Sequence, residues 1–162
     1  MKYPCKDRGG YRNFNFFYKT NNIVYYHLGH DFNCDLGDDV ISIKDGKIIF
    51  SGQVNGFGGT NKKGGVVIVN HYNFVALYGH MEINKNYNVN DIIKEGDILG
   101  KISDYYTIDK NTNKEINVPH LHLGIWLGND LPPFKWGYDI DRKRWVDPVI
   151  YLKNLYDKEK GV

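Results

Sequence analysis

The chain consists of short apolar runs separated by clusters of glycine, asparagine and aspartate. Runs of this length, rich in Val, Ile and Tyr and bounded by turn residues, are typical of β-strands. The stretch Lys44–Lys47 predicts a hairpin turn, because its Asp-Gly pair tolerates the positive φ of tight turns. A second turn is predicted at Glu95–Asp97. The pattern therefore predicts a mostly β chain, with strands at residues 23–26, 40–43, 47–54, 65–69, 74–78, 98–102 and 121–127.

Only the C-terminal tail has the pattern of a helix. Asp147 can cap a helix, and Pro148 suits the first helical position. An apolar stripe follows, formed by Val149, Ile150, Leu152 and Leu155. Two longer segments, residues 105–118 and 129–144, have neither pattern and are predicted to be long connections, which often form walls of binding sites.

Composition strengthens the prediction of sheet structure. The 162 residues include one alanine against 18 glycines and 13 tyrosines, so strong helix formers are scarce. A chain of this length fits one domain with a sizeable buried core. We assign residues 23–162 to a single domain and leave open whether residues 1–22, an N-terminal segment, are part of it.

Charge and targeting signals give little reason to expect several classes of partner. A net charge of +2 gives no reason to expect a nucleic-acid partner. The sequence has no apolar stretch long enough to span a membrane, and its first twenty residues lack the apolar core of a signal peptide. Cys5 and Cys34 are too few for a disulfide framework, so cysteine does not indicate a compartment.

Histidines carry the strongest sign of chemistry. His120 and His122 stand two apart ahead of an apolar run, and residues two apart on a strand point to the same face. His27 and Asp31 lie four apart across a predicted strand end and turn, and His80 ends another predicted strand. Two imidazoles and one carboxylate can hold zinc, and two further histidines can move protons, as metal-assisted hydrolysis requires.

Together these motifs resemble the lysostaphin/LytM-type zinc endopeptidases of the M23 peptidase family. The resemblance rests on His27-x3-Asp31, Tyr78-Gly79-His80 and Pro119-His120-Leu121-His122, in the family's order along the chain. Other stretches that match are Gly46-Lys47-Ile48 with Gly52, Val66–His71, Lys94–Gly100 and Asp147-Pro148. The resemblance runs from about Tyr25 to Leu152 and implies antiparallel β-sheets around an open groove.

Site roles follow from the resemblance. It implies that His27, Asp31 and His122 bind one zinc ion and that His80 and His120 are the catalytic pair. It further implies hydrolysis of peptide stems or cross-links in bacterial peptidoglycan, and therefore a location in the cell envelope or outside the cell. His71 matches a family histidine outside the metal site, where we expect a structural hydrogen-bonding role.

Aromatic residues in the two long connections are candidates for groove walls that contact substrate. The candidates are Tyr105, Tyr106, Phe134, Trp136 and Tyr138, and of these we select Tyr105, Tyr106 and Trp136 as substrate-binding residues. Both connections are longer than the corresponding stretches of the family, so the resemblance does not specify which peptide bond is cut.

Two other classes of protein are open alternatives. The first is a non-hydrolytic module of the same fold that binds or activates another cell-wall enzyme. The presence of all three ligands and both further histidines favours the enzyme over this module. The second is a carrier domain, since Lys94–Leu99 resembles lipoyl and biotinyl domains. That alternative leaves the histidines unexplained, and the turn at Lys44–Lys47 lacks the flanking pattern of a carrier lysine.

Overall fold

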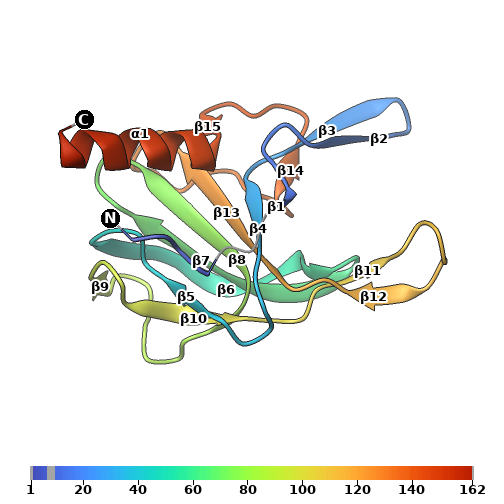
Figure 1. Ribbon diagram of the computed structural model, residues 1–162, viewed down its shortest axis with the longest axis horizontal. Helices are drawn as coiled ribbons and strands as arrows, with labels where there is room; N and C mark the ends of the chain where they lie inside the picture. The colour runs from blue at the N-terminus through green and yellow to red at the C-terminus, as the bar shows by residue number, and fades with distance from the viewer. Residues whose placement is uncertain (1, 7–9, 162) are drawn as a thin grey trace.

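The computed structural model describes residues 2–6 and 10–161, which form many short strands and one C-terminal helix (Figure 1). The predicted mostly β fold with a short C-terminal helix is confirmed. No helix in the described part of the chain is long and apolar enough to cross a membrane. In chain order the elements are β1 (Gly10–Arg12), β2 (Phe17–Thr20), β3 (Ile23–His27), β4 (His30–Asn33), β5 (Asp39–Ile41), β6 (Gly46–Gly59), β7 (Lys62–Asn70), β8 (Val75–Ile83), β9 (Ile92–Ile93), β10 (Ile98–Ile102), β11 (Tyr106–Ile108), β12 (Glu115–Asn117), β13 (His120–Trp126), β14 (Tyr138–Asp139), β15 (Trp145–Val146) and α1 (Pro148–Lys160).

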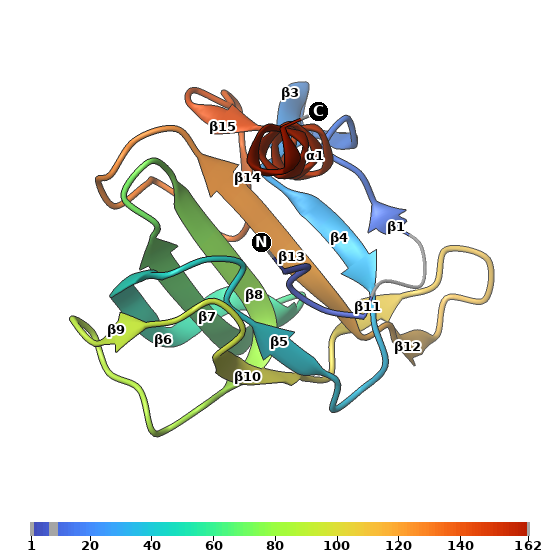
Figure 2. The same ribbon diagram turned by 60° about the vertical axis from the view of Figure 1, so that its left-hand side comes forward.

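Two open sheets contain these strands. Within the described residues, twelve strands form one sheet along the path β1-β4-β13-β8-β7-β6-β11-β12, with β5, β9, β10 and β15 attached to its members. The strands β4, β13, β8 and β7 lie side by side in its middle (Figure 2). The second sheet has the order β14-β3-β2. The strand pairs are antiparallel, apart from a parallel contact of β11 with β6 at Tyr106 and Gly59.

Strand β13 separates the two hydrophobic clusters of the core. All seven of its residues are buried. Leu121, Leu123 and Ile125 point into one cluster, whereas Trp126 points into the other. Because side chains alternate along a strand, His120 and His122 lie on the same face as Trp126. The central strand thus places two histidines at one end of a well-packed sheet.

The C-terminal helix covers the first of these clusters. Asp147 caps it, since its Oδ1 accepts hydrogen bonds from the backbone N–H groups of Val149 at 2.9 Å and Ile150 at 3.3 Å. Leu152 is buried in the cluster at 1% exposure, and Gly161 ends the helix in the left-handed conformation with φ 71°. The helix predicted from the tail is therefore confirmed, together with its cap.

Two local predictions need correction. The hairpin expected at Lys44–Lys47 is wrong, because β5 pairs with β10 while β6 pairs with β7 and β9. Residues 44–47 instead form a bend between β5 and β6, two strands that pair with different neighbours and not with each other. The long connection expected at residues 105–118 contains the hairpin β11–β12. Its strands have largely exposed side chains, so they lack the alternating apolar pattern by which strands are recognised.

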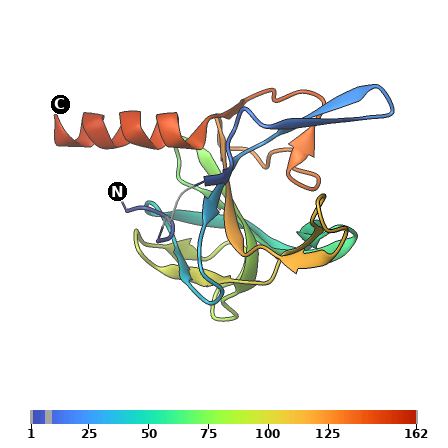
Figure 3. The ribbon, with the colours of Figure 1, turned by 45° about the vertical axis from the view of Figure 1, so that its right-hand side comes forward.

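The N-terminal segment 2–6 packs along β5. Ile41 donates its N–H to the carbonyl of Pro4 at 2.8 Å. Cys5 and Cys34 are both buried, and their sulfur atoms lie 2.6 Å apart. Both chain ends lie at one end of the molecule, whereas the hairpins β2–β3 and β11–β12 extend from the other (Figures 1 and 3).

Candidate metal centre

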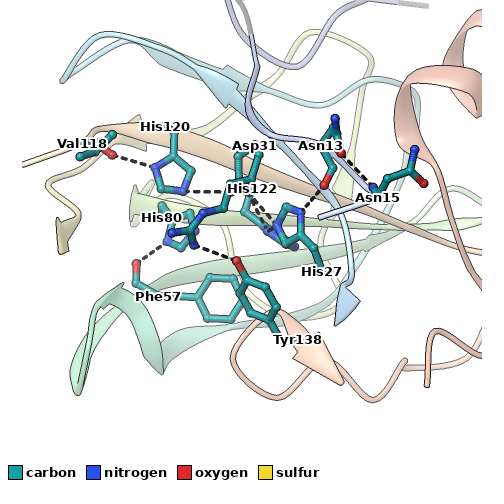
Figure 4. A network of polar contacts seen from close by, with 11 residues as sticks. Asn13, Asn15, His27, Asp31, Phe57, His80, Val118, His120, His122 and Tyr138 are labelled. Atoms are coloured by element: carbon teal, nitrogen blue, oxygen red, sulfur yellow. Dashed lines mark hydrogen bonds and ion pairs between the residues drawn. The ribbon is translucent and has the colours of Figure 1, made fainter. Parts of the chain in front are cut away.

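The register of three neighbouring strands brings the polar side chains together. His122 on β13 pairs with Asp31 on β4 on one side and with Gly79 on β8 on the other. Directly opposed residues of antiparallel strands carry their side chains on the same face of the sheet. His27 is the last residue of β3 and reaches the same place through the turn into β4. Figure 4 shows the resulting cluster.

Gly29 allows that turn to pass close to β13. A Cβ at this position would clash with the carbonyl oxygen of Leu123 and lie 2.7 Å from Nε2 of His122. Only glycine therefore fits between the turn and the histidine. The close approach places His27 and Asp31, which lie on either side of the turn, against His122.

Three ligand atoms form a nearly equilateral triangle. Nε2 of His27 and Nδ1 of His122 lie 3.0 Å apart, and Oδ1 of Asp31 lies 3.1 Å from the first and 3.0 Å from the second. All three side chains are buried, with exposures of 0%, 2% and 2% for His27, Asp31 and His122. Two imidazole nitrogens and a carboxylate oxygen that converge in this way could hold a metal ion.

The donor set and its surroundings fit zinc. A tetrahedral ion at 2.0–2.1 Å from each ligand separates its ligands by about 3.3 Å, close to the spacing found here. Nδ1 of His27 donates a hydrogen bond to the backbone carbonyl of Asn13 at 3.0 Å. That bond fixes the ring and leaves Nε2 with its lone pair toward the triangle, as the outer contacts of metal-bound histidines commonly do.

His80 reaches the cluster because it forms a β-bulge. Gly65 of β7 pairs with Met81, and Val66 pairs with Gly79, so His80 is an extra residue with no partner in this pairing. Its backbone is left-handed, with φ 66°. Under strict alternation His80 would point away from Gly79 and from the cluster. The bulge turns it instead onto His120, with ring centroids 4.4 Å apart.

The two further histidines are oriented by backbone carbonyls. Nδ1 of His80 donates to the carbonyl of Phe57, and Nδ1 of His120 donates to the carbonyl of Val118, each at 2.7 Å. Both Nε2 atoms therefore carry the lone pair. Nε2 of His120 lies 3.6 Å from Oδ2 of Asp31. Each histidine can accept a proton at Nε2 and return it.

A second group of possible metal ligands shares the carboxylate of Asp31. Donor atoms of His80, His120 and Asp31 all lie within 4.8 Å of one another. The contact of His120 with Asp31, at 3.6 Å, is longer than any side of the first triangle. His27, Asp31 and His122 are therefore the better candidate site.

Burial favours the neutral form of His80, His120 and His122, whereas the surrounding histidines favour the charged form of Asp31. Burial lowers the pKa of His122 to about 4 and the pKa of His80 well below its ordinary value. Burial also lowers the pKa of His120, and the charge of Arg12 adds to that shift. For Asp31, burial alone would raise the pKa, but electrostatic interactions with His27 and His120 and hydrogen bonds from histidine hold it well below the usual range. Neutral imidazoles with an ionised carboxylate are the form that binds metal ions.

A groove of about 700 Å³ lies beside the cluster. Tyr105 lines it and packs on both histidines of the pair, with ring centroids 4.6 Å from His80 and 4.7 Å from His120. Tyr138 lines it as well, with its ring centroid 5.1 Å from that of His27. Two residues of the groove wall, Tyr105 and Tyr138, therefore contact the histidines of the cluster.

Most of the residues singled out from the sequence meet at this place. The five polar residues lie in one cluster, and Tyr105 and Trp136 line the groove. Tyr106 lies elsewhere: it borders a neighbouring depression, where Lys62 stacks on its ring at 4.2 Å. His71 stays outside the cluster and bridges the carbonyl of Asp45 at 3.0 Å and the hydroxyl of Tyr78 at 3.1 Å.

Several contributors had weak signals or none in the sequence. Backbone carbonyls, such as those of Asn13 and Phe57, orient the histidines, and a backbone carbonyl has no residue signature. Arg12 belongs to a three-residue strand that no pattern indicated. Tyr138, in contrast, is one of the aromatic candidates named from the sequence, and it lines the groove.

The fold and the cluster together define a β protein with a candidate metal centre beside a groove. Comparison with known families matches residues 25–133, about two thirds of the chain, to Peptidase family M23. The chain belongs to this family. Comparison with curated protein sequences found no match.

Solved structures of this fold include the catalytic domain of the antimicrobial peptidase lysostaphin from Staphylococcus simulans. It is 23% identical, with a TM-score of 0.61, over 90% of this chain and 92% of that domain. LytU is 20% identical, with a TM-score of 0.61, over 94% of this chain and 91% of that one. A zinc-containing peptidase from Vibrio cholerae is 19% identical, with a TM-score of 0.60, over 90% of this chain and 37% of that one.

Proposed function

We propose that this chain is a zinc-dependent endopeptidase that hydrolyses peptide stems or cross-links of bacterial peptidoglycan. The observation that carries the proposal is the 3.0–3.1 Å triangle of His27, Asp31 and His122 beside a second pair of histidines. Membership of a peptidase family supports the reaction class. The similar structures of lysostaphin, an antimicrobial peptidase, and of a zinc-containing peptidase support the substrate and the metal.

In this proposal His27, Asp31 and His122 hold the zinc ion. Bound zinc supplies a Lewis acid that polarises the scissile carbonyl and lowers the pKa of water. Asp31 contributes the negative charge of the ligand set, and the carbonyl of Asn13 keeps His27 in the tautomer that can bind. All three side chains are buried.

His80 and His120 handle the protons. Each has its Nδ1–H tied to a backbone carbonyl, so Nε2 is the atom that can take a proton. One of the two accepts a proton from the attacking water at Nε2 and passes it to the departing amine. The other stabilises the developing oxyanion once its own Nε2 carries a proton. Because burial keeps both imidazoles neutral, a base is present at neutral pH. A wall-degrading enzyme of this kind acts in the cell envelope or outside the cell.

Mass spectrometry of digested peptidoglycan tests the proposal. Purified walls of several peptide types are incubated with zinc-loaded protein, with and without a chelator. Products that carry a new amine and disappear with chelator would support the proposal, and their masses identify the bond. Zinc-loaded protein that yields no product from any wall type would overturn it and favour a non-hydrolytic binding or activating module.

A further inference from the structure

A turn between β1 and β2 contacts the candidate ligand His27. Residues 13–16 form this turn and connect the two sheets. The carbonyl of Asn13 accepts hydrogen bonds from the backbone N–H of Phe16 at 3.1 Å and from Nδ1 of His27 at 3.0 Å (Figure 4). Asn13 and Asn15 are exposed. The orientation of a buried imidazole therefore depends on how firmly an exposed turn is held.

Arg142, in the long connection 129–144, holds this turn from outside. Its Nη2 donates a hydrogen bond of 2.7 Å to the carbonyl of Phe14. The guanidinium packs on two rings, with Cζ 4.7 Å from the ring centroid of Phe14 and 4.5 Å from that of Tyr26. Its Nε is buried. A planar guanidinium packed on two aromatic faces has little freedom to turn, so its bond to the Phe14 carbonyl is fixed in one geometry.

The contacts of Arg142 join the turn to the strand that carries the candidate ligand. Phe14 belongs to the turn, and Tyr26 directly precedes His27 on β3. The connection that contains Arg142 also contacts His27 itself, because Tyr138 pairs with it across β14 and β3 and packs its ring at 5.1 Å. One connection thus contacts both the ligand and the turn that orients it.

Packing alone does not require a guanidinium at this position. The unbranched side chain of methionine also packs well on aromatic faces. What Arg142 adds is a charge-assisted hydrogen bond, roughly twice as strong as a bond between neutral groups. The accepting carbonyl belongs to Phe14, the residue next to Asn13, whose own carbonyl orients His27. The hydrogen bond therefore acts at the place that controls the imidazole.

We propose that Arg142 is a positioning residue for the candidate metal centre. It holds the turn 13–16 so that the carbonyl of Asn13 retains its bond with His27, whose Nε2 then stays available as a ligand. The inference rests on the proposed function, because it specifies how one ligand of the proposed zinc ion is oriented. Loss of the bond from Arg142 should weaken metal binding although every ligand is still present.

Zinc affinity tests the proposal. Wild type and Arg142→Met are titrated with zinc in competition with a chromophoric chelator. Methionine can pack on both rings but cannot donate to the carbonyl of Phe14. We expect the Kd to rise about 10-fold, the lower end of the usual effect of outer contacts on metal affinity. Arg142→Lys keeps a charged donor without the planar stacking and should raise the Kd by about threefold. It is the test variant if Arg142→Met does not fold.

Arg144→Met is the matched control. Arg144 belongs to the same connection, stacks on Trp126 at 4.3 Å and donates to Asp130 at 2.6 Å. These contacts do not involve the turn 13–16. The control should therefore lower the melting temperature, as Arg142→Met does, yet leave the Kd for zinc unchanged. An equal rise of the Kd in both variants would show that general loss of stability weakens the site, and would overturn the proposal.

NMR of the metal-free protein reports on the positioning directly. In wild type, the spectrum of His27 should show its proton on Nδ1, whereas Arg142→Met should show a mixture of the two tautomers. The backbone amides of Phe16 and His27 bond to carbonyls of the turn. Their hydrogen exchange should be faster in Arg142→Met than in wild type and unchanged in Arg144→Met.

The outcomes separate this inference from the proposed function. Zinc binding with an equal Kd in wild type and Arg142→Met would leave the proposed function standing and overturn the role of Arg142. A larger Kd with an unchanged tautomer and unchanged exchange would overturn that role as well. Wild type that binds no zinc would overturn the proposed function, and the tautomer of His27 in the metal-free variants would then decide the role of Arg142.

Discussion

Nε2 of His120 lies 3.6 Å from Oδ2 of Asp31, whose other oxygen contacts His27 and His122. The carboxylate of Asp31 therefore contacts the other two candidate ligands through Oδ1 and approaches His120, one of the two further histidines, through Oδ2. Any change at Asp31 alters both groups.

Asp31→Asn should abolish zinc binding and lower turnover at least about 100-fold. The substitution keeps the shape of the side chain but removes the negative charge of the ligand set. Metal analysis after dialysis should show less than a fifth of an equivalent of zinc, taken as a rough threshold for lost affinity. Asp35→Asn, an exposed carboxylate on the same segment, should retain full zinc content and activity. Retention of a full equivalent in Asp31→Asn would show that Asp31 is not a ligand.

Removal of the metal should destabilise the protein. The candidate ligands come from separate strands and converge only in the folded chain, so zinc should stabilise the native state. At free zinc of about 100 times Kd we expect a gain of about 2.7 kcal/mol, or roughly 5–10 °C in melting temperature. Thermal melts with chelator and with added zinc provide the measurement. Magnesium, which prefers oxygen ligands, should produce little shift.

His80→Gly and His80→Ala should both keep zinc and lose about 10²- to 10⁴-fold in rate. The two variants should differ in stability. Glycine accepts the left-handed backbone at φ 66°, whereas alanine is strained there by roughly 1 kcal/mol. His80→Gly should therefore melt at the higher temperature. It also leaves a ring-sized space that added imidazole should fill, with partial recovery of turnover. Loss of zinc from either variant would contradict the assigned role.

Acid should destabilise the fold through His71. Burial lowers the pKa of this residue from 6.5 to about 4. Between these values the unfolded chain binds a proton that the folded chain does not, so stability falls as pH decreases through this window. The contribution lost is up to about 3 kcal/mol.

The variant His71→Gln isolates that effect. Denaturant unfolding of wild type and His71→Gln is measured from pH 7 to 4. Chelator is present in both cases, so that the histidines of the candidate metal centre contribute equally to the free energy of unfolding of the two proteins. The stability advantage of wild type should shrink as pH falls, because protonation disrupts the bonds of His71 with Asp45 and Tyr78. A constant advantage across the range would contradict this explanation.

Mild oxidation should join Cys5 to Cys34. Their sulfur atoms lie 2.6 Å apart, so a small approach suffices to form a disulfide. Intact-mass analysis should show a loss of about 2 Da, reversed by reductant. Closing a loop of this length should raise the free energy of unfolding by about 3–4 kcal/mol. Cys34→Ser should show neither change, and two titratable thiols after oxidation of wild type would contradict the prediction.

Sequence reasoning recovered the features that depend on periodicity. The apolar run at residues 121–127 predicted a strand, and the spacing of His120 and His122 placed both on one face, as β13 shows. The helix was predictable from Asp147 and Pro148, because capping is a local effect. These features need no knowledge of the rest of the fold.

Features that depend on which strands pair with each other could not be predicted from the sequence in the same way. His80 reaches the cluster through a bulge that exists only because β7 and β8 shift register beside it. The turn at Lys44–Lys47 has hairpin residues, yet the strands on either side pair elsewhere. Cys5 and Cys34 meet because the N-terminal segment packs along β5, a tertiary contact without a local pattern.

The position of the two chain ends has a practical consequence. Both lie at the end of the molecule opposite the β2–β3 and β11–β12 hairpins (Figures 1 and 3). Residues of β2 and β11 line the groove. A bead or linker attached at either terminus would therefore leave the groove facing outward. Immobilised protein should be able to work on an insoluble polymer and then be recovered for reuse.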